Sequence, residues 1–293
     1  MCRTENGEYL FPENRLTAEV FRETENFRIT VIHDRSFLDF GTKCRRFEGI
    51  IKSLKNTDKK ITIQGNPGSN FMSSFAVLFR MHGFRIRSLC FSRSETKSLS
   101  FILTEKFSDP FELFRDRRLF LERREEILLD KNSILLPEYG MNSESEKGLH
   151  SLWKEIQEIA GEGTLVLDAG SGLTYLSALR HLENDRLSLC AVSLGEKKEK
   201  MEKRLSLYWK DFFPDENEPY FRLIRPVTGA SFGSVNRELQ NFIQNESKKG
   251  FYLEPVYSAK TVYTILKLAE QGSLSGNIWY LHQGGRLNHW RLF

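Results

Sequence analysis

The apolar residues of this chain follow two different spacings along the sequence. Phe47, Ile50, Ile51 and Leu54 recur at helical intervals, which predicts an amphipathic helix that begins just after Lys43. Short apolar runs predict strands at residues 60–64, 86–91, 164–168, 187–194 and 277–282. Helices are expected between them, at residues 70–83, 150–160 and 260–271 and from residue 174. This alternation predicts an α/β fold with parallel sheets flanked by helices.

One further helix is predicted from a capping pattern. Ser108 and Asp109 precede Pro110, an arrangement typical of an N-cap followed by proline at the first helical position. The helix would run to about Glu126. The chain would then return to a sheet at residues 127–129 or 134–136.

Composition narrows the class of protein. The 293 residues are enough for two domains, and 40% hydrophobic with 28% charged residues is typical of a soluble globular protein. No signal-peptide segment opens the chain, and no apolar run approaches the roughly 18 residues of a membrane span. We therefore expect no membrane partner. The 4 cysteines lack metal-site spacing, so we expect free thiols, no metal site and a cytoplasmic location. The net charge of +4 suits an anionic cofactor and substrate but is too small to indicate nucleic-acid binding.

Five short motifs follow one another in a definite order. They occupy residues 41–48, 68–70, 169–174, 254–260 and 282–285. In the first, Lys43 opens a helix beside Arg45 and Arg46, and nearby positive charge lowers a lysine pKa toward the range that imine chemistry needs. The third is a glycine-rich turn between a strand and a helix, where backbone N–H groups can bind phosphate.

The third motif also allows a different interpretation. Residues 166–172 resemble the first motif of S-adenosylmethionine-dependent methyltransferases. Those enzymes need an acidic residue at the end of the next strand to hold the ribose. Here that strand ends at Leu194, and Glu196 comes two residues later. The remaining chain is also short for that fold, which favours the phosphate site.

Taken together, the five motifs resemble those of the pyridoxal-phosphate enzymes with the tryptophan-synthase-β-like fold. Among these, the aminocyclopropane-carboxylate deaminase and D-cysteine desulfhydrase family is the most similar. The resemblance runs from about residue 30 onward. It implies a pyridoxal 5'-phosphate cofactor, a homodimer and a small α/β domain at residues 49–134, inserted into a large domain made of residues 1–48 and 135–293. The cofactor is expected between the two domains.

The resemblance also implies roles for single residues. Lys43 would hold the cofactor aldehyde and then remove the substrate Cα proton. Ser69 would bind the substrate carboxylate, Asn70 the phenolic oxygen of the cofactor, and Tyr257 would face the substrate. Further cofactor contacts would come from Gly170, Ser171, Gly172, Leu173 and Thr174 at the phosphate, from Ser258 at the pyridine nitrogen, and from Gln283 and Gly284 beside the ring.

Several positions depart from the family pattern. Phe71 stands in place of a histidine, Leu173 in place of a glycine, and Gln283 in place of a threonine. Phe232, before Gly233, stands where the family has a second tyrosine. The residue at the pyridine nitrogen is glutamate in deaminases and threonine in desulfhydrases, whereas here it is Ser258.

These departures favour one reaction over another. A serine hydroxyl does not hold a protonated pyridine nitrogen as a carboxylate does, so the ring is a weaker electron sink. We therefore expect a lyase that acts at Cα of a small amino acid and eliminates a good β-leaving group, as a D-cysteine desulfhydrase does, giving a 2-oxo acid and ammonia. The alternatives are a non-catalytic relative that binds pyridoxal phosphate or another metabolite and, third, a methyltransferase-like binder.

Overall fold

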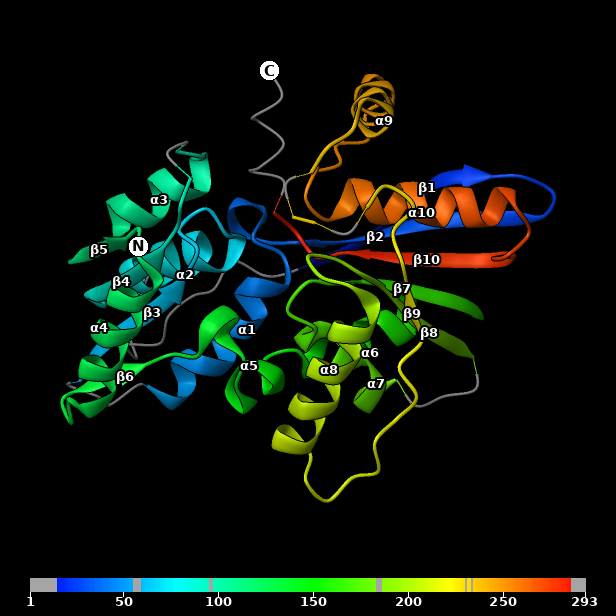
Figure 1. Cartoon of the computed structure of the whole chain (residues 1–293). Helices are drawn as coiled ribbons and strands as arrows, with labels where there is room; N and C mark the ends of the chain where they lie inside the picture. Colours follow the sequence, from blue (N-terminus) through cyan, green and yellow to red (C-terminus); the bar gives the residue numbers. More distant parts are fainter. Residues whose placement is uncertain are drawn as a thin grey trace, which may run out of the picture. The chain divides into compact units, whose positions relative to one another are not determined.

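The structure is a computed structural model that describes residues 15–54, 59–94, 97–182, 186–229, 231–232 and 234–285 (Figure 1). The described residues divide into two compact units. The smaller unit contains residues 36–148, and the larger unit contains residues 15–35 and 149–285. Each unit has its own sheet. The domain boundaries expected near residues 49 and 134 stay a prediction.

The larger unit is built on a six-stranded sheet with the order β1-β2-β10-β7-β8-β9. Its strands are β1 (Arg15–Glu23), β2 (Phe27–Arg35), β7 (Gly163–Ala169), β8 (Leu187–Ser193), β9 (Leu223–Ile224) and β10 (Gly276–His282). β1 runs antiparallel to β2, whereas the neighbouring pairs from β2 to β9 are parallel. The carboxyl ends of β2, β10, β7 and β8 therefore lie at one edge of the sheet, which is where open parallel sheets bind ligands.

Helices cover both faces of this sheet (Figure 1). One face carries α9 (Arg237–Lys248) and α10 (Ser258–Glu270), and the other carries α6 (His150–Ile159), α7 (Leu173–His181) and α8 (Lys198–Phe212). Buried apolar side chains of α10 pack with those of β2, β7 and β10 in one core. The central strands are apolar because both of their faces are covered.

The smaller unit contains a four-stranded sheet with the order β5-β4-β3-β6, in which neighbouring strands are parallel. Its elements are β3 (Lys60–Gly65), β4 (Ile86–Phe91), β5 (Phe111–Phe114), β6 (Ser133–Leu135), α1 (Thr42–Ser53), α2 (Asn70–Met81), α3 (Leu99–Phe107), α4 (Arg117–Leu129), α5 (Ser143–Lys147) and 3-10 turns at Phe37–Asp39 and Glu138–Gly140. Phe47 of α1 packs edge-on against Phe75 and Phe79 of α2, with ring centroids 5.6 and 4.8 Å apart. The apolar stripe that predicts α1 is thus the surface that joins it to α2.

The predicted α/β fold with parallel sheets is confirmed, whereas the helix expected over residues 108–126 is confirmed only from residue 117 onward, and its predicted start at Ser108 is wrong. β5 occupies Phe111–Phe114, and α4 begins only at Arg117. Asp116 caps α4 by accepting the N–H of Arg118 at 2.7 Å. Pairing of β5 with β4 overrides the capping pattern at Ser108, because sheet formation outweighs local propensity. The chain returns to the sheet at β6, close to the second of the two expected positions.

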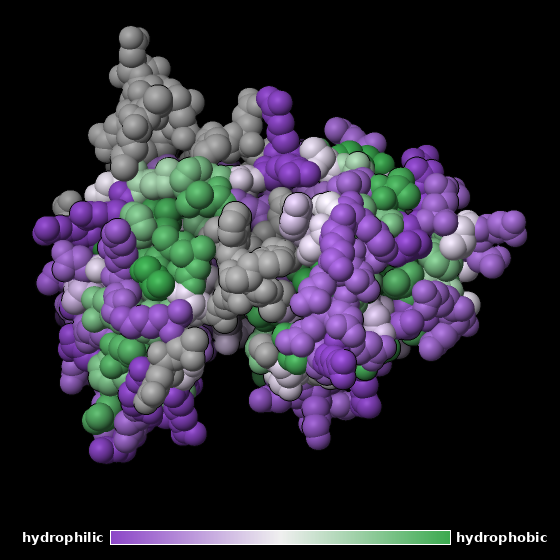
Figure 2. All heavy atoms as spheres, turned by 90° about the horizontal axis from the view of Figure 1, so that it is seen from above, coloured by the Kyte–Doolittle hydropathy of each residue, from purple (hydrophilic) through white to green (hydrophobic). Residues whose placement is uncertain are grey.

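The two units present different surfaces. Apolar side chains gather over part of the smaller unit, whereas hydrophilic side chains cover much of the larger one in the same view (Figure 2). The exposed apolar residues of the smaller unit include Leu99 and Ile102 of α3. None of the described helices combines the length and the apolar character needed to cross a membrane.

Candidate functional site

A glycine-rich loop connects β7 to α7. We call residues 170–172 the glycine loop; it follows Ala169 and precedes Leu173, the first residue of α7. Gly172, the N-cap residue of α7, has a φ of 96°, a left-handed conformation that glycine adopts without strain, and as a glycine it brings no side chain to cap the helix. The first N–H groups of a helix have no acceptor within it, and the helix dipole makes this end positive. The start of α7 therefore has the features of a phosphate site.

Two residues of the glycine loop have close neighbours where a side chain would stand. A Cβ atom on Gly170 would lie 2.7 Å from Cε1 of Tyr257, and one on Gly172 would lie 2.4 Å from Cδ2 of Leu205. Both distances are shorter than an ordinary van der Waals contact, so a side chain at either position would require its neighbour or the loop to move. Arg204 donates a hydrogen bond to the carbonyl of Gly170. The glycine loop is therefore held between Tyr257 and α8.

The start of α10 is organised by a buried carboxylate. Glu254 accepts the backbone N–H groups of Val256, Tyr257 and Ser258, the first and third at 2.8 Å. Burial raises the pKa of the Glu254 carboxyl to about 7, against the three N–H donors, which lower it. These bonds fix the backbone of residues 256–258. Glu254 thereby fixes the backbone position from which the Tyr257 side chain extends.

The Ser258 hydroxyl belongs to the same turn. It accepts the N–H of Glu254 at 2.8 Å and donates to the Glu254 carbonyl at 3.3 Å. Only 2% of Ser258 is exposed. Its predicted contact with a pyridine nitrogen stays a prediction, and the contact would require the hydroxyl proton to leave the Glu254 carbonyl.

The segment after β10 is tied to the end of β7. Gln283 Nε2 donates to the carbonyl oxygen of Asp168 at 3.0 Å, and the N–H of Gly284 donates to Nδ1 of His282 at 3.2 Å. The Asp168 carboxylate accepts the hydroxyl of Tyr280, whose oxygen lies 3.0 and 3.2 Å from the two carboxylate oxygens. Burial, and then the charge of Asp168, raises the pKa of Tyr280 well above its usual value, so its hydroxyl remains a donor. Gln283 and Gly284 are thus fixed beside the strand that leads into the glycine loop.

Phe232 lies against Tyr257. Their ring centroids are 5.4 Å apart, and the ring planes are tilted by 56°. A Cβ atom on Gly195, which follows β8, would lie 1.9 Å from the Phe232 ring, so this ring also covers the loop between β8 and α8. Phe232 thus adjoins Tyr257, as expected for the position of the second tyrosine, but it brings no hydroxyl. Gly233 lies outside the described residues.

In the smaller unit, Lys43 lies in the first turn of α1 and is half-buried. Arg45 and Arg46, on the same helix, are both buried. Arg46 donates to the carbonyls of Tyr139 and Gly140, the second at 3.1 Å. Burial lowers the pKa of Arg46 to about 10, so the guanidinium is still charged at neutral pH. The positive charge expected near Lys43 is therefore present one helical turn away.

Ser69 and Asn70 begin α2. Ser69 is the N-cap and accepts the N–H of Met72 at 3.2 Å, as its sequence position predicts. Asn70 is buried as the first helical residue. Phe71 is also buried, and its ring centroid lies 4.5 Å from that of Phe75. The position that carries histidine in the family is here part of the apolar core.

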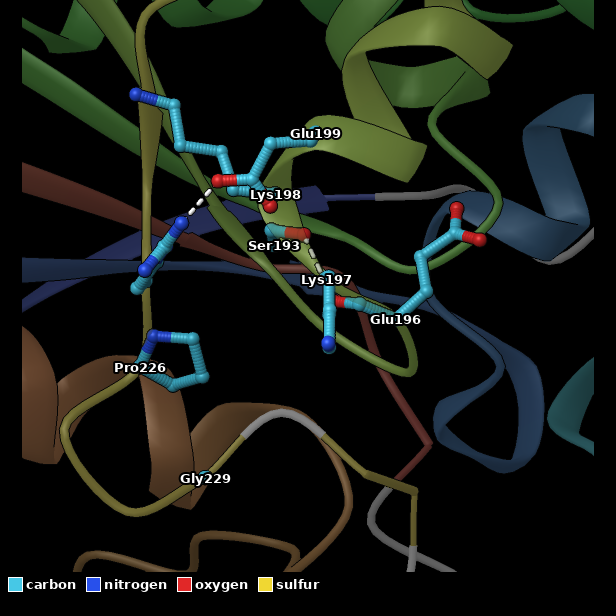
Figure 3. Close-up of a pocket in the computed structure, with 8 residues that line it drawn as sticks. Ser193, Glu196, Lys197, Lys198, Glu199, Pro226 and Gly229 are labelled. Carbon is cyan, nitrogen blue, oxygen red and sulfur yellow. Dashed lines mark hydrogen bonds and ion pairs between the residues drawn. The ribbon is translucent and has the colours of Figure 1, made fainter.

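A pocket of about 430 Å³ lies at the carboxyl ends of β8 and β9 (Figure 3). It is lined by Ser193, Glu196, Lys197, Lys198, Glu199, Arg225, Pro226 and Gly229. Arg225 pairs with Glu199, whereas the Glu196 carboxylate turns away from the pocket and pairs with Arg204 at 2.9 Å. The sequence does not predict this pocket, because alternating lysines and glutamates indicate an ordinary solvated helix face.

The predicted site residues fall into two groups. The larger unit holds Gly170, Ser171, Gly172, Leu173, Thr174, Tyr257, Ser258, Gln283 and Gly284, around the carboxyl ends of β7 and β10 and the start of α10. The smaller unit holds Lys43, Ser69 and Asn70, at the starts of α1 and α2. Lys260 of α10 is fully buried, which the sequence does not reveal.

Sequence comparison gives a partial match. No family model matches the chain. Over 146 residues it is 25% identical to a protein from Pyrococcus abyssi named "Putative 1-aminocyclopropane-1-carboxylate deaminase". The match covers 47% of this chain and 44% of that protein, so the chain spans less than half the length of this curated relative.

Structural comparison covers nearly the whole chain. The crystal structure of an ACC deaminase homologue superposes with a TM-score of 0.77 at 19% identity, over 91% of this chain and 89% of the other. A hydrogen sulfide-producing enzyme from Fusobacterium nucleatum superposes with a TM-score of 0.68 at 14% identity, over 94% and 96% of the two chains. The tryptophan-synthase-β-like fold is thereby confirmed. Together with the five motifs, these matches support a distant similarity to the aminocyclopropane-carboxylate deaminase and desulfhydrase family.

Proposed function

We propose that the chain is a pyridoxal-phosphate-dependent lyase that acts at Cα of a small amino acid. The observation that carries this proposal is the glycine loop, which precedes a helix whose N-cap is a glycine and which packs at Gly170 against Tyr257. The relatives support it, since one is named a putative deaminase of an amino acid and another produces hydrogen sulfide. D-Cysteine, or a similar amino acid with a β-thiol, is the proposed substrate.

The residues of the glycine loop fit a phosphate group. The side chains of Tyr257 and Leu205 pack against the positions where Cβ atoms of Gly170 and Gly172 would stand, so the two glycines keep the loop compact beside the start of α7. The N–H groups at the start of α7 would donate to the phosphate oxygens. Ser171 is partly exposed and Thr174 lies in the first turn of α7, so both hydroxyls suit the same anion.

The remaining roles belong to the smaller unit and to Tyr257. Lys43 would hold the cofactor aldehyde through its amine and later accept the Cα proton of the substrate. Ser69 uses a lone pair to accept the N–H of Met72, which leaves its hydroxyl proton for a substrate carboxylate oxygen. The cofactor, when bound, supplies an electron sink for the pair left at Cα.

Thiol elimination is the proposed reaction because the chain offers little help to a poor leaving group. The Cα proton passes to Lys43, the Cβ–S bond breaks and its electron pair leaves with the thiolate. Water then hydrolyses the released enamine to a 2-oxo acid and ammonia. A thiolate leaves readily because its conjugate acid has a pKa of roughly 8.5. Opening a cyclopropane needs an added nucleophile or acid, and Phe232 has no hydroxyl to provide it.

Two alternatives remain in view. A non-catalytic relative is motivated by Phe71, Leu173, Phe232 and Gln283, of which Phe71 and Leu173 are buried. A methyltransferase-like binder is disfavoured, because β8 ends at Ser193 and the later Glu196 is paired with Arg204. We further propose that the protein is cytoplasmic and forms a homodimer; light scattering of the purified protein would test the dimer.

The proposed function is tested by colour and then by turnover. Purified protein incubated with pyridoxal phosphate and dialysed should keep a visible absorbance that borohydride removes. It should also form pyruvate from D-cysteine. A colourless protein after this treatment would contradict the cofactor assignment. A coloured protein that is inactive with D-cysteine and with aminocyclopropane carboxylate would support the non-catalytic relative.

A further inference from the structure

Lys260 of α10 is a buried lysine whose ammonium group binds a single loop. Its side chain is fully buried along its length. Nζ donates to the carbonyl oxygen of Ser231 at 2.5 Å, to Oγ of Ser234 at 3.1 Å and, more weakly, to the carbonyl oxygen of Gly229 at 3.5 Å. Burying an ammonium group is costly unless acceptors replace its water. Here the acceptors all come from the segment before α9.

A second anchor lies one helical turn further along α10. Thr264 Oγ1 accepts the N–H of Val227 at 3.2 Å and donates to the carbonyl of Lys260 at 2.7 Å. Residues four apart lie on the same face of a helix, so Lys260 and Thr264 hold two points of one loop. We call this segment the 227–234 loop; residues 227–229, 231, 232 and 234 of it are described.

This loop carries groups that face the candidate site. Phe232 packs on Tyr257 and on Gly195, yet 46% of it remains exposed, so burial alone does not fix it. Gly229 lies in the wall of the pocket together with Pro226 (Figure 3). The position of the loop therefore decides both where the Phe232 ring stands and how that wall is placed.

Lys260 does more than fill space in the core, because its ammonium group holds the 227–234 loop to α10 by hydrogen bonds; we call this arrangement the clamp. An apolar side chain of the same length would fill the space but would leave the carbonyls of Gly229 and Ser231 without this donor. Burial lowers the pKa of Lys260, and the Glu254 carboxylate acts in the opposite direction. The same carboxylate fixes the backbone at Tyr257. The Phe232 side of this contact is thus held from α10 by Lys260, and the Tyr257 side is held by Glu254 in the turn before α10.

We propose that Lys260 is a positioning residue, which clamps the 227–234 loop to α10 so that Phe232 stays packed on Tyr257 and keeps this tyrosine oriented toward an amino-acid substrate. The clamp itself follows from the contacts of the larger unit. Its effect on the substrate rests on the proposed function.

The clamp is tested without cofactor or activity, by chymotrypsin cleavage after Phe232 mapped by mass spectrometry. Lys260→Met keeps the length and removes the donor, and it should speed this cleavage at least tenfold. Lys260→Arg should restore most of the protection. The control is Lys267→Met, on the same helix, whose Nζ pairs with Glu270 at 3.0 Å and touches no loop residue named here. Cleavage after Phe232 that is unchanged in Lys260→Met would overturn the clamp.

If Lys260→Met does not fold, Thr264→Val probes the same clamp at its second anchor, with the same expected direction. The effect on substrate is then read in the holoenzyme. Lys260→Met and Phe232→Ala should each raise KM for D-cysteine at least fivefold with little change in kcat, and the double variant should be no worse than either. If the double variant raises KM by the product of the two single effects, or if KM does not change in the single variants, Lys260 does not act through Phe232. A protein without cofactor colour would instead refute the proposed function and leave the cleavage result standing.

Discussion

Gly170→Ala isolates the geometry of the glycine loop with a single added carbon. The new Cβ would lie 2.7 Å from Cε1 of Tyr257, whereas ordinary contact begins at 3.4 Å, so the ring or the loop must move by about 0.7 Å. Gly170 does not have a positive φ, so backbone strain does not contribute. Overpacking of this kind costs roughly 1–3 kcal/mol. If this free energy destabilises the cofactor-bound protein relative to the cofactor-free protein, cofactor affinity should drop by roughly 5- to 150-fold.

The assay is a pyridoxal-phosphate titration followed by absorbance, with thermal unfolding as the check on folding. Gly161→Ala is the matched control, because a Cβ atom there meets nothing within 4 Å. Tyr257→Ala should relieve the clash, so the Gly170→Ala substitution should cost little in that background. Affinity equal to that of Gly161→Ala would refute the assignment of the glycine loop. If Gly170→Ala lowers cofactor affinity equally in the natural chain and in the Tyr257→Ala background, the clash with Tyr257 is not the cause.

Three further predictions address the amine, the reaction and a buried carboxyl. Lys43→Ala should abolish the visible absorbance of the cofactor-loaded protein while its circular dichroism is unchanged, and borohydride reduction with peptide mapping should place the pyridoxyl group on Lys43; a label on another lysine would contradict the assignment. D-Cysteine should be turned over faster than aminocyclopropane carboxylate, and Phe232→Tyr should narrow the ratio of the two kcat/KM values; a faster reaction with the cyclopropane in the natural chain would contradict thiol elimination. Because burial raises the pKa of Glu254 from 4.5 to about 7, the folded chain holds this proton more tightly than the unfolded chain, so its contribution to stability is complete below pH 4.5 and is lost as the pH rises to about 7. That loss of stability is of the order of 3 kcal/mol. The difference between the urea midpoints at pH 5 and pH 8 should therefore be smaller in Glu254→Gln than in the natural chain. An equal difference would show that Glu254 does not titrate in this range.

The fold was predictable because its elements have strong local signals. The stripe from Phe47 to Leu54 and the apolar runs that became β4 and β10 describe buried surfaces directly. The region from Ser108 to Glu126 was not predictable in the same way. There a good capping pattern competed with four residues that pair with β4, and only the sheet decides between them. The antiparallel pairing of β1 with β2 likewise depends on a partner that the alternation of strands and helices does not reveal.

The candidate site was predictable where the chemistry is carried by contiguous residues. The glycine loop and the Glu254–Ser258 turn are local structures, and each is recognisable as a motif. The packing of Phe232 on Tyr257 joins residues far apart in the sequence, so only the resemblance suggested it. Lys260 and Glu196 look like surface charges in the sequence. Their roles follow from carbonyl groups and an arginine that the fold brings to them.

The place of β10 in the sheet has a consequence for how the larger unit is synthesised. β10 is the last of the described strands, yet it lies between β2 and β7 near the middle of the sheet. The strand order cannot be completed until residues 276–282 have left the ribosome, whereas residues 36–148, with their own sheet, are available much earlier. Contacts between segments so distant in sequence form slowly, and the waiting strands expose unpaired edges meanwhile. We therefore expect a chain truncated before residue 276 to aggregate through β2 and β7, and the smaller unit to acquire protection from proteolysis first.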